Sequence, residues 1–134
     1  LETDKEKMLQ MVIVGQPELE DNLSRPEMRQ LRQRIFVNCR LKHLKHSEVE
    51  SYIDRRLFIA GSSGQVQFSA GAKRTIAKRS QGVPRVINKI CDYALTAGYV
   101  ADEFVIRKIH VKKALAELGD WELSKTIFSK DHNQ

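Results

Sequence analysis

Apolar residues recur at three- and four-residue spacing through most of the chain after residue 44, which is typical of helices that pack one face inward. The pattern predicts four helices: one ending at Gly61, one between Ser69 and Gln81, one beginning at Pro84 and one ending near Gly119. Their inward positions are Val49, Tyr52, Ile53, Leu57, Ala60, Ala72, Ile76, Ala77, Val86, Ile87, Ile90, Cys91, Ala94, Leu95, Val111, Ala114, Leu115 and Leu118.

Capping signals place the helix starts. Residues 47–50 and 24–27 both have the Ser-x-x-Glu spacing of a capping box, the first for the helix after residue 44. The second box predicts a short helix over residues 25–34, and Pro17 opens another that runs through residue 23.

Two segments before residue 44 have the patterns of strands. Residues 11–14 form an apolar, mostly β-branched run ended by turn formers, which predicts a buried strand. Residues 35–41 alternate apolar side chains with other ones, which predicts a strand with one face inward.

Together these elements predict a mainly α fold with a small α/β part. We expect three parts: residues 1–43 with two strands and short helices, residues 44–118 with the four helices, and residues 119–134, where the periodicity is lost, as a linker or tail.

Composition adds a basic surface. The chain has 134 residues, enough for one core, and 23 Lys and Arg against 17 Asp and Glu give a net charge of +6. This charge favours polyanionic partners, but the basic residues are spread out, so a solvated surface is the simpler interpretation. No apolar run approaches the ~20 residues of a membrane span and no signal peptide is visible, so we expect a cytoplasmic location. Residue 1 is Leu, which indicates a piece of a longer protein.

Neither a metal site nor a complete catalytic motif is indicated. Cys39, His43 and His46 supply too few ligands for structural zinc, which takes four, so we expect no metal there. Residues 61–64 lack the Lys-Ser/Thr that completes a phosphate-binding loop. Cys39 and Cys91 each lie in an apolar stretch, where buried, reduced thiols are expected.

Residues 82–85, Gly-Val-Pro-Arg, stand at the start of the third helix. Gly82 permits backbone angles closed to other residues, and Pro84 fixes φ near the helical value where its missing N–H is not needed. Arg85 is thereby held at a helix entrance, where its guanidinium, free N–H groups and the helix dipole all favour an anion. From these four residues alone, an exposed Arg at an ordinary helix start is the simpler interpretation.

Arginines crowd the helix predicted before the second strand, and at helical spacing Arg25, Arg29 and Arg32 share a face. With Arg34 they form either a solvated basic face or an arginine finger. Such a finger reaches the transferring phosphate of a neighbouring subunit and is worth about 10³ to 10⁵ in rate.

Five segments stand in a characteristic order: Leu-Glu-Thr-Asp-Lys-Glu-Lys at 1–7, Val-Ile-Val-Gly-Gln-Pro-Glu-Leu at 12–19, Arg-Gln-Leu-Arg-Gln-Arg-Ile at 29–35, Ala-Gly at 60–61 and Gly-Val-Pro-Arg-Val-Ile-Asn at 82–88. In this order the chain closely resembles bacterial secretion ATPases of the general secretion pathway protein A type, which are AAA+ proteins. The family is also similar to pilus-biogenesis and exosortase-associated ATPases. The match covers residues 1–118.

The resemblance implies the C-terminal portion of an AAA+ module, in which residues 44–118 form the helical lid. It implies that residues 11–15 carry sensor 1, with Gln16 as the polar sensor and Glu18 as its rival. Arg85 matches the sensor 2 arginine, which contacts the γ-phosphate of ATP bound by the same subunit.

Arg34 matches the arginine finger that serves the adjacent subunit, and Arg29 and Arg32 are its alternatives. The Walker A lysine and Walker B carboxylates of the family lie upstream of the matching segment. We therefore expect the chain to hydrolyse no ATP alone and to bind no cofactor tightly, ATP and Mg²⁺ belonging to the intact parent.

The resemblance also implies partners. These are other subunits of the same ATPase in a homo-oligomer, and proteins that assemble an envelope secretion or pilus apparatus, with a parent that an inner-membrane anchor would suit. In AAA+ sheets the phosphate-loop strand separates the two strands predicted here. We expect dimerisation, strand swapping or local rearrangement to cover their edges.

The alternative is a basic helical module that binds DNA through Lys73, Arg74, Lys78 and Arg79. Against it, the basic residues are not concentrated at the start of one recognition helix, and aromatic residues are sparse. We therefore do not expect nucleic acid as the main partner.

Overall fold

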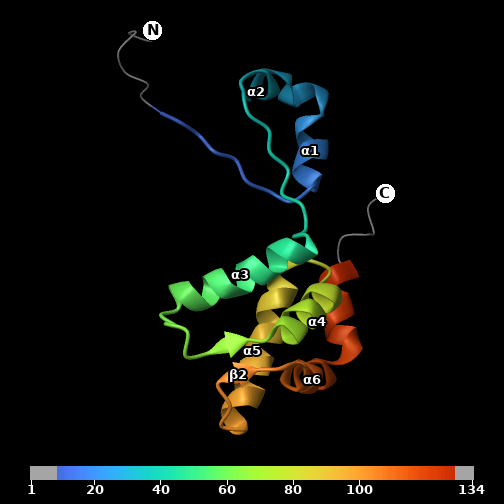
Figure 1. The fold of residues 1–134 in the computed structure, drawn as a ribbon. Coiled ribbons are helices and arrows are strands. Elements are labelled where there is room, and N and C mark those ends of the chain that lie inside the picture. Colours follow the sequence, from blue (N-terminus) through green and yellow to red (C-terminus); the bar gives the residue numbers. More distant parts are fainter. Residues whose placement is uncertain (1–8, 129–134) are drawn as a thin grey trace. The chain divides into compact units, whose positions relative to one another are not determined.

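The computed structural model describes residues 9–128, and the chain divides into two compact units, residues 1–40 and 41–134 (Figure 1). The predicted class, mainly α with a small α/β part, is confirmed. The first unit contains α1 (Glu18–Leu23), the 3₁₀ helix η1 (Pro26–Met28) and α2 (Arg29–Gln33). The second contains α3 (His46–Ile59), β1 (Gln67–Phe68), α4 (Ala70–Ser80), α5 (Pro84–Val100), β2 (Val105–Ile106) and α6 (Lys108–Phe128).

The second unit holds the apolar core, which the inward faces of its four helices build as predicted. Among the predicted positions, Tyr52, Leu57, Cys91 and Leu95 are partly buried, and Ala60 is exposed because it follows the end of α3. The buried apolar side chains are Val49, Ile53, Phe68, Ala72, Ile76, Ala77, Val86, Ile87, Ile90, Ala94, Ile106, Val111, Ala114, Leu115, Leu118 and Leu123.

A two-stranded parallel sheet, absent from the sequence-based prediction, joins the starts of two helices. Gln67 pairs with Val105, and Phe68 pairs with Ile106. Each strand has two residues, too few for a period-2 pattern to stand out. Gly98 admits β2 against α5, because a Cβ there would lie 2.3 Å from Cδ1 of Ile106.

Capping residues then start the helices that follow the strands. The Oγ of Ser69 accepts a hydrogen bond from the N–H of Ala72 (3.2 Å) at the start of α4. The Nδ1 of His110, a buried side chain, accepts one from the N–H of Arg107 (2.9 Å) at the start of α6. Imidazole thus takes the place that a carboxylate has in a capping box.

The two strands predicted before residue 44 are wrong: residues 11–14 and 35–41 are unpaired extended chain with exposed side chains. Val12 is 84% exposed and Phe36 is 95% exposed. An extended segment satisfies its N–H and C=O groups only through a neighbouring strand, and no segment of residues 9–40 is paired in a sheet. That another chain covers the edges of such strands stays a prediction.

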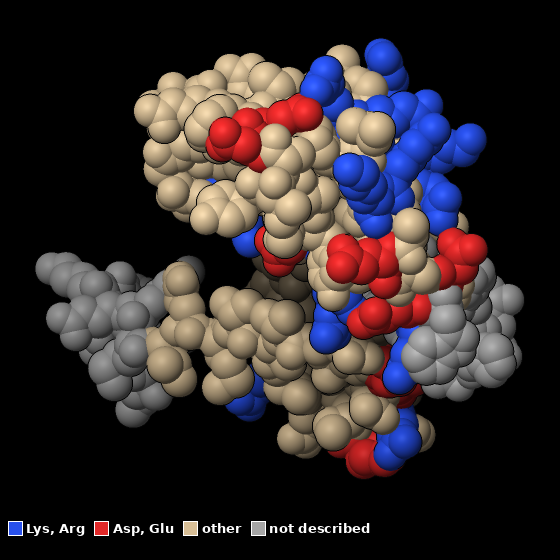
Figure 2. Space-filling view, turned by 90° about the horizontal axis from the view of Figure 1, so that it is seen from below, with Lys and Arg blue, Asp and Glu red and all other residues tan. Residues whose placement is uncertain are grey.

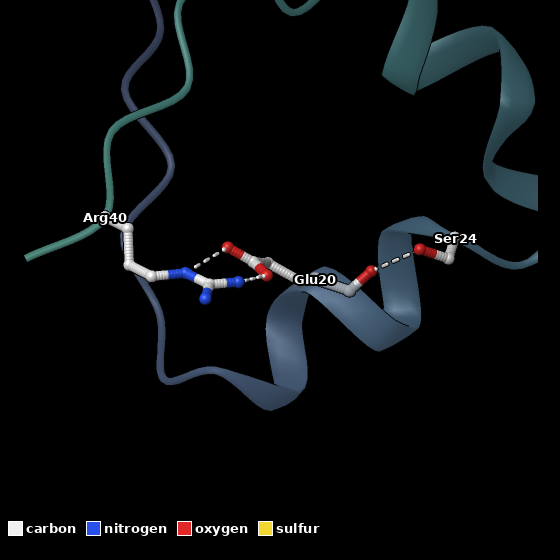
Figure 3. Close-up of polar contacts among 3 residues, drawn as sticks. All are labelled: Glu20, Ser24 and Arg40. Atoms are coloured by element: carbon white, nitrogen blue, oxygen red, sulfur yellow. Dashed lines mark hydrogen bonds and ion pairs between the residues drawn. The ribbon is translucent and has the colours of Figure 1, made fainter.

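The capping boxes were also misplaced. The hydroxyl of Ser24 donates to the C=O of Glu20 (2.8 Å) at the end of α1 and does not cap the following helix, which is split into η1 and α2 (Figure 3). Arg40 contacts both carboxylate oxygens of Glu20, Nε at 3.2 Å from Oε1, and this contact raises the pKa of Arg40. In α3 the capping carboxylate is that of Glu48, whose Oε2 accepts from the N–H of Lys45 (2.7 Å). That helix starts at His46, before the predicted box.

The predicted tail is helical as far as the structure describes it. Gly119 (φ 69°, ψ 151°) interrupts α6, and the chain then resumes a helix to Phe128. Leu123 is buried, Asp120 bonds to Arg79 of α4 (2.9 Å), and Glu122 contacts Lys89 of α5. These contacts hold residues 120–125 against the second unit, so a linker beginning at residue 119 is wrong; residues 129–134, like residues 1–8, lie outside the described residues. Among the described residues, no helix combines the length and apolar character that a bilayer crossing requires.

The two cysteines differ in environment. Cys39 is exposed, contrary to prediction, because the strand that would have buried it does not form. Cys91 lies partly buried in α5, and burial raises the pKa of its thiol to about 12. The neighbouring Asp92 carboxylate raises the pKa further, and Arg56 opposes it.

We expect iodoacetamide at pH 8 to alkylate Cys39 and to spare Cys91 in the folded chain. With a pKa of about 12, only about one Cys91 thiol in ten thousand is thiolate at that pH. Mass spectrometry of tryptic peptides measures the labelling, and denatured protein is the control in which both cysteines react. Equal labelling rates in the folded chain would contradict the burial of Cys91.

Candidate functional site

The turn between α4 and α5 is held by a close backbone contact. Gln81 (φ 51°) and Gly82 (φ 74°) both have left-handed backbones, and Gly82 is buried. The N–H of Leu44 donates to the C=O of Gly82 at 2.8 Å. A Cβ on Gly82 would lie 1.9 Å from the carbonyl oxygen of Leu44, so only glycine fits here.

Ser80 supports this turn from inside. Its side chain is buried, and its Oγ accepts a hydrogen bond from the N–H of Gly82 (3.2 Å). Its backbone C=O accepts from the N–H of Val83 (3.0 Å). These bonds satisfy the end of α4 while turning the chain directly into α5.

Arg85 is the second residue of α5, and the helix start fixes its backbone. Val83 is extended and precedes Pro84 at the first helical position, and the C=O of Val83 accepts from the N–H of Ile87 (3.0 Å). No acidic residue occupies the first turn of α5. The side chain of Arg85 is exposed and makes no hydrogen bond or ion pair among residues 9–128. An uncompensated cation thus stands at the positive end of a 17-residue helix.

Two contacts fix the first turns of α5 sideways. The hydroxyl of Tyr52 in α3 donates to Oδ1 of Asn88 (2.9 Å), and the pair is partly buried. Lys89, the next residue, forms an ion pair with Glu122 of α6. Arg85 therefore extends from a helix end that α3 and α6 both hold.

The other predicted site residues lie in the first unit. Arg34 follows the end of α2 with an exposed side chain, and Gln16 precedes α1, its C=O accepting from the N–H of Leu19 (2.8 Å). Arg32 donates from Nη1 to the C=O of Leu23 (2.8 Å), so it is engaged locally. Within this unit no hydrogen bond or ion pair joins Gln16 to Arg34 in the part that the structure describes.

The residues present do not fit a metal ion. Among residues 9–128, no three His, Cys, Asp or Glu side chains come together as a ligand set, Cys39, His43 and His46 included. Mg²⁺ therefore finds no protein ligands in the described part of this chain.

Sequence reasoning found Arg85 but missed the residues that position it. Leu44 carried no signal, because its contribution is a backbone N–H. Asn88 belonged to the segment that supports the resemblance, yet its partner Tyr52 is 36 residues away. Ser80, a buried polar residue before Gln-Gly, was the one local signal available.

Comparison with known proteins completes the picture. No family model matches the chain. It is 46% identical over 99 residues to general secretion pathway protein A of Aeromonas hydrophila, which covers 74% of this chain and 18% of that protein. The predicted resemblance is confirmed.

The likeness to general secretion pathway protein A is accompanied by a second one. Holliday junction branch migration complex subunit RuvB is 34% identical over 86 residues in Bifidobacterium adolescentis and 33% identical in Bifidobacterium longum. These matches cover 64% of the chain and about a quarter of each RuvB, 23% and 24%. They support an AAA+ ATPase region, and the chain spans less than a quarter of the length of these relatives.

We expect Gly82→Ala to lower the free energy of unfolding by at least about 2 kcal/mol, because the new Cβ meets the Leu44 carbonyl at a left-handed backbone. Gly71→Ala in α4 is the matched control: nothing lies within 4 Å of its Cβ, and it should change stability by less than about 1 kcal/mol. Urea unfolding followed by circular dichroism measures both. Equal effects would contradict the tight passage of Leu44 over Gly82.

Proposed function

We propose that this chain supplies the nucleotide-sensing and lid portion of an AAA+ ATPase that powers assembly of a bacterial secretion or pilus apparatus. Residues 44–118 form the lid, and Arg85 is its sensor 2 arginine. The observation that carries the proposal is the exposed, unpaired guanidinium of Arg85 at a rigid helix N-terminus. A γ-phosphate offers such a cation the charge and the acceptor oxygens that the described residues withhold.

The position of Leu44 gives the sensor a route to the rest of the protein. Residues 41–45 join the two units along the chain, and Leu44 is bonded to the turn that precedes Arg85. Movement of α5 on binding or release of the phosphate therefore displaces the connecting segment directly. This couples the nucleotide state to the angle between core and lid.

The first unit contributes the other two proposed sensors. Arg34 is the proposed finger toward the nucleotide of an adjacent subunit; its exposed side chain supports this role, whereas the bond of Arg32 to Leu23 makes Arg32 the weaker alternative. Arg29 remains an alternative. Gln16 is the proposed sensor 1 residue and Glu18, the first residue of α1, its rival, although the strand expected before them does not form here.

ATP is the proposed ligand of the intact parent, and Mg²⁺ would be held by its phosphates and by residues of the parent. The chain alone, without Walker A and Walker B motifs in these 134 residues, is proposed to be inactive. The proposed partners are further subunits of the same ATPase in a homo-oligomer, and proteins of a secretion or pilus apparatus. The name of the relative from Aeromonas hydrophila supports the secretion assignment.

The structure offers DNA less than the sequence did. Two of the four basic residues on α4 are already paired, Lys73 with Asp54 (2.6 Å) and Arg79 with Asp120 (2.9 Å). Arg74 and Lys78 remain, which is a small cationic surface for phosphate backbone contacts. The RuvB relatives are named for a Holliday junction, and this is the remaining support for the alternative.

We expect Arg85→Ala in the intact parent ATPase to lower ATP turnover about 10- to 100-fold, the worth of a charged hydrogen bond to phosphate. Arg74→Ala is the matched control, an exposed arginine of α4 with no hydrogen bond or ion pair to the described residues, and should leave turnover unchanged. A coupled phosphate-release assay measures turnover. Equal turnover in the Arg85→Ala and wild-type proteins would remove the sensor 2 assignment.

Arg34→Ala should abolish most of the turnover while leaving nucleotide binding intact, since a finger acts on the site of another subunit. Mixing Arg34→Ala subunits with subunits that lack the Walker B glutamate tests this. Activity restored in the mixture is expected, because each mixed interface then pairs an intact finger with an intact site. A mixture as inactive as its parts would assign Arg34 to its own subunit or to structure.

A further inference from the structure

One end of the second unit exposes an unusual number of apolar side chains. They come from the end of α5, the loop after it, β2 and the first turn of α6, which meet at one end of the unit (Figure 1). The exposed fractions are 86% for Tyr99, 80% for Val100, 63% for Phe104, 48% for Val105 and 56% for Ile109. We name these five side chains the apolar tip.

The tip is held by backbone bonds. The N–H of Asp102 donates to the C=O of Tyr99 (3.1 Å), and that of Glu103 donates to the C=O of Gly98 (2.9 Å). Phe104 then accepts from the N–H of Gln67 (3.1 Å), which places it beside β1. The apolar side chains therefore project from a fixed loop with its backbone groups paired, as insertion into an apolar phase requires.

Lysines flank the tip on the outer face of α6. At 100° per residue, Ile109 lies between Lys108 and Lys112 on one side and Lys113 on the other. All three lysines are exposed and make no hydrogen bond or ion pair among the described residues. Lys112 also borders a hollow with Arg79 of α4, which extends the cationic area onto the neighbouring helix.

The acidic groups at this end are fewer and partly compensated. Asp102 and Glu103 lie in the loop, and Glu103 is paired with Arg107, whose hydrogen bond lowers the pKa of the carboxyl. Seen from this end, Lys and Arg gather on one side of the molecule beside an area with few charges (Figure 2).

We propose that this end of the lid binds the surface of a bilayer that contains anionic phospholipid. The apolar tip enters the interfacial region, where aromatic side chains such as Tyr99 and Phe104 are favoured. The lysine stems lie along it and their ammonium groups reach the lipid phosphates. Charge complementarity chooses this occupant, because three unpaired lysines oppose the same surface of a second copy. Duplex DNA would leave Val100, Val105 and Ile109 without an apolar partner.

This inference is independent of the proposed nucleotide sensing, since Arg85 begins α5 and the tip lies at its other end, 14 residues on. A lid that binds lipid at one end and phosphate at the other would tie the ATPase cycle to a membrane. The two ends are tested separately, in different assays and with different variants.

The test is co-sedimentation of the 134-residue chain with vesicles of phosphatidylcholine alone, or mixed in equal amounts with phosphatidylglycerol. We expect binding to the anionic vesicles that falls as salt is raised, and little binding to the neutral ones. Lys108→Gln with Lys112→Gln should weaken binding about 30-fold, at roughly 5-fold for each lysine. Tyr99→Ser with Phe104→Ser should also weaken it at least about 10-fold, through loss of buried apolar area.

Matched controls remove equal charge elsewhere: Arg25→Gln with Lys42→Gln, both exposed and unpaired among the described residues, should bind as the wild type does. Thermal unfolding shows that each variant is folded, and Tyr99→Ser alone serves if the double variant is not. Absence of binding to anionic vesicles, or equal weakening by the control pair, would overturn the proposal. So would self-association that the Tyr99→Ser change abolishes, or tighter binding to a DNA duplex that it leaves unchanged.

Discussion

The lid depends on one place where two backbones nearly touch, the passage of Leu44 over Gly82. The hydrogen bond between them is ordinary in length, but it requires a residue without a side chain at a left-handed backbone. From this point the chain runs one way into α3 and the other way into α5. The start of the lid and the helix that carries Arg85 are therefore built on the same contact, and neither can move far without the other.

Helix periodicity was sufficient to predict the core of the second unit. Residues such as Val49, Ile76, Ile90 and Val111 are buried where a 3.6-residue period placed them, because each helix has only one apolar face to bury. Leu123 was missed because its helix is short and follows a break at Gly119, so that it has no repeated pattern of its own. Its burial comes from contacts with helices far away in the sequence.

The first unit shows the limit of reading strands from pattern. Residues 11–14 and 35–41 have strand-like sequences, yet a strand exists only together with a partner, and alternation says nothing about where that partner is. The same holds for the candidate site. The helix-start residues predicted Arg85 at its place, because capping chemistry is local, whereas Tyr52 and Asn88 meet only through the packing of α3 on α5.

The short parallel sheet bears on how the lid is formed in time. Gln67 and Val105 are paired although 38 positions separate them, and both α4 and α5 lie in between. The pairing closes a long loop and gains few backbone bonds, so its entropic cost is recovered only once those helices already pack together. The order of events follows: helices first, sheet afterwards. The end of the lid that holds β2 and the start of α6 is thus the last part to acquire its shape, and the first to lose it when the lid opens locally.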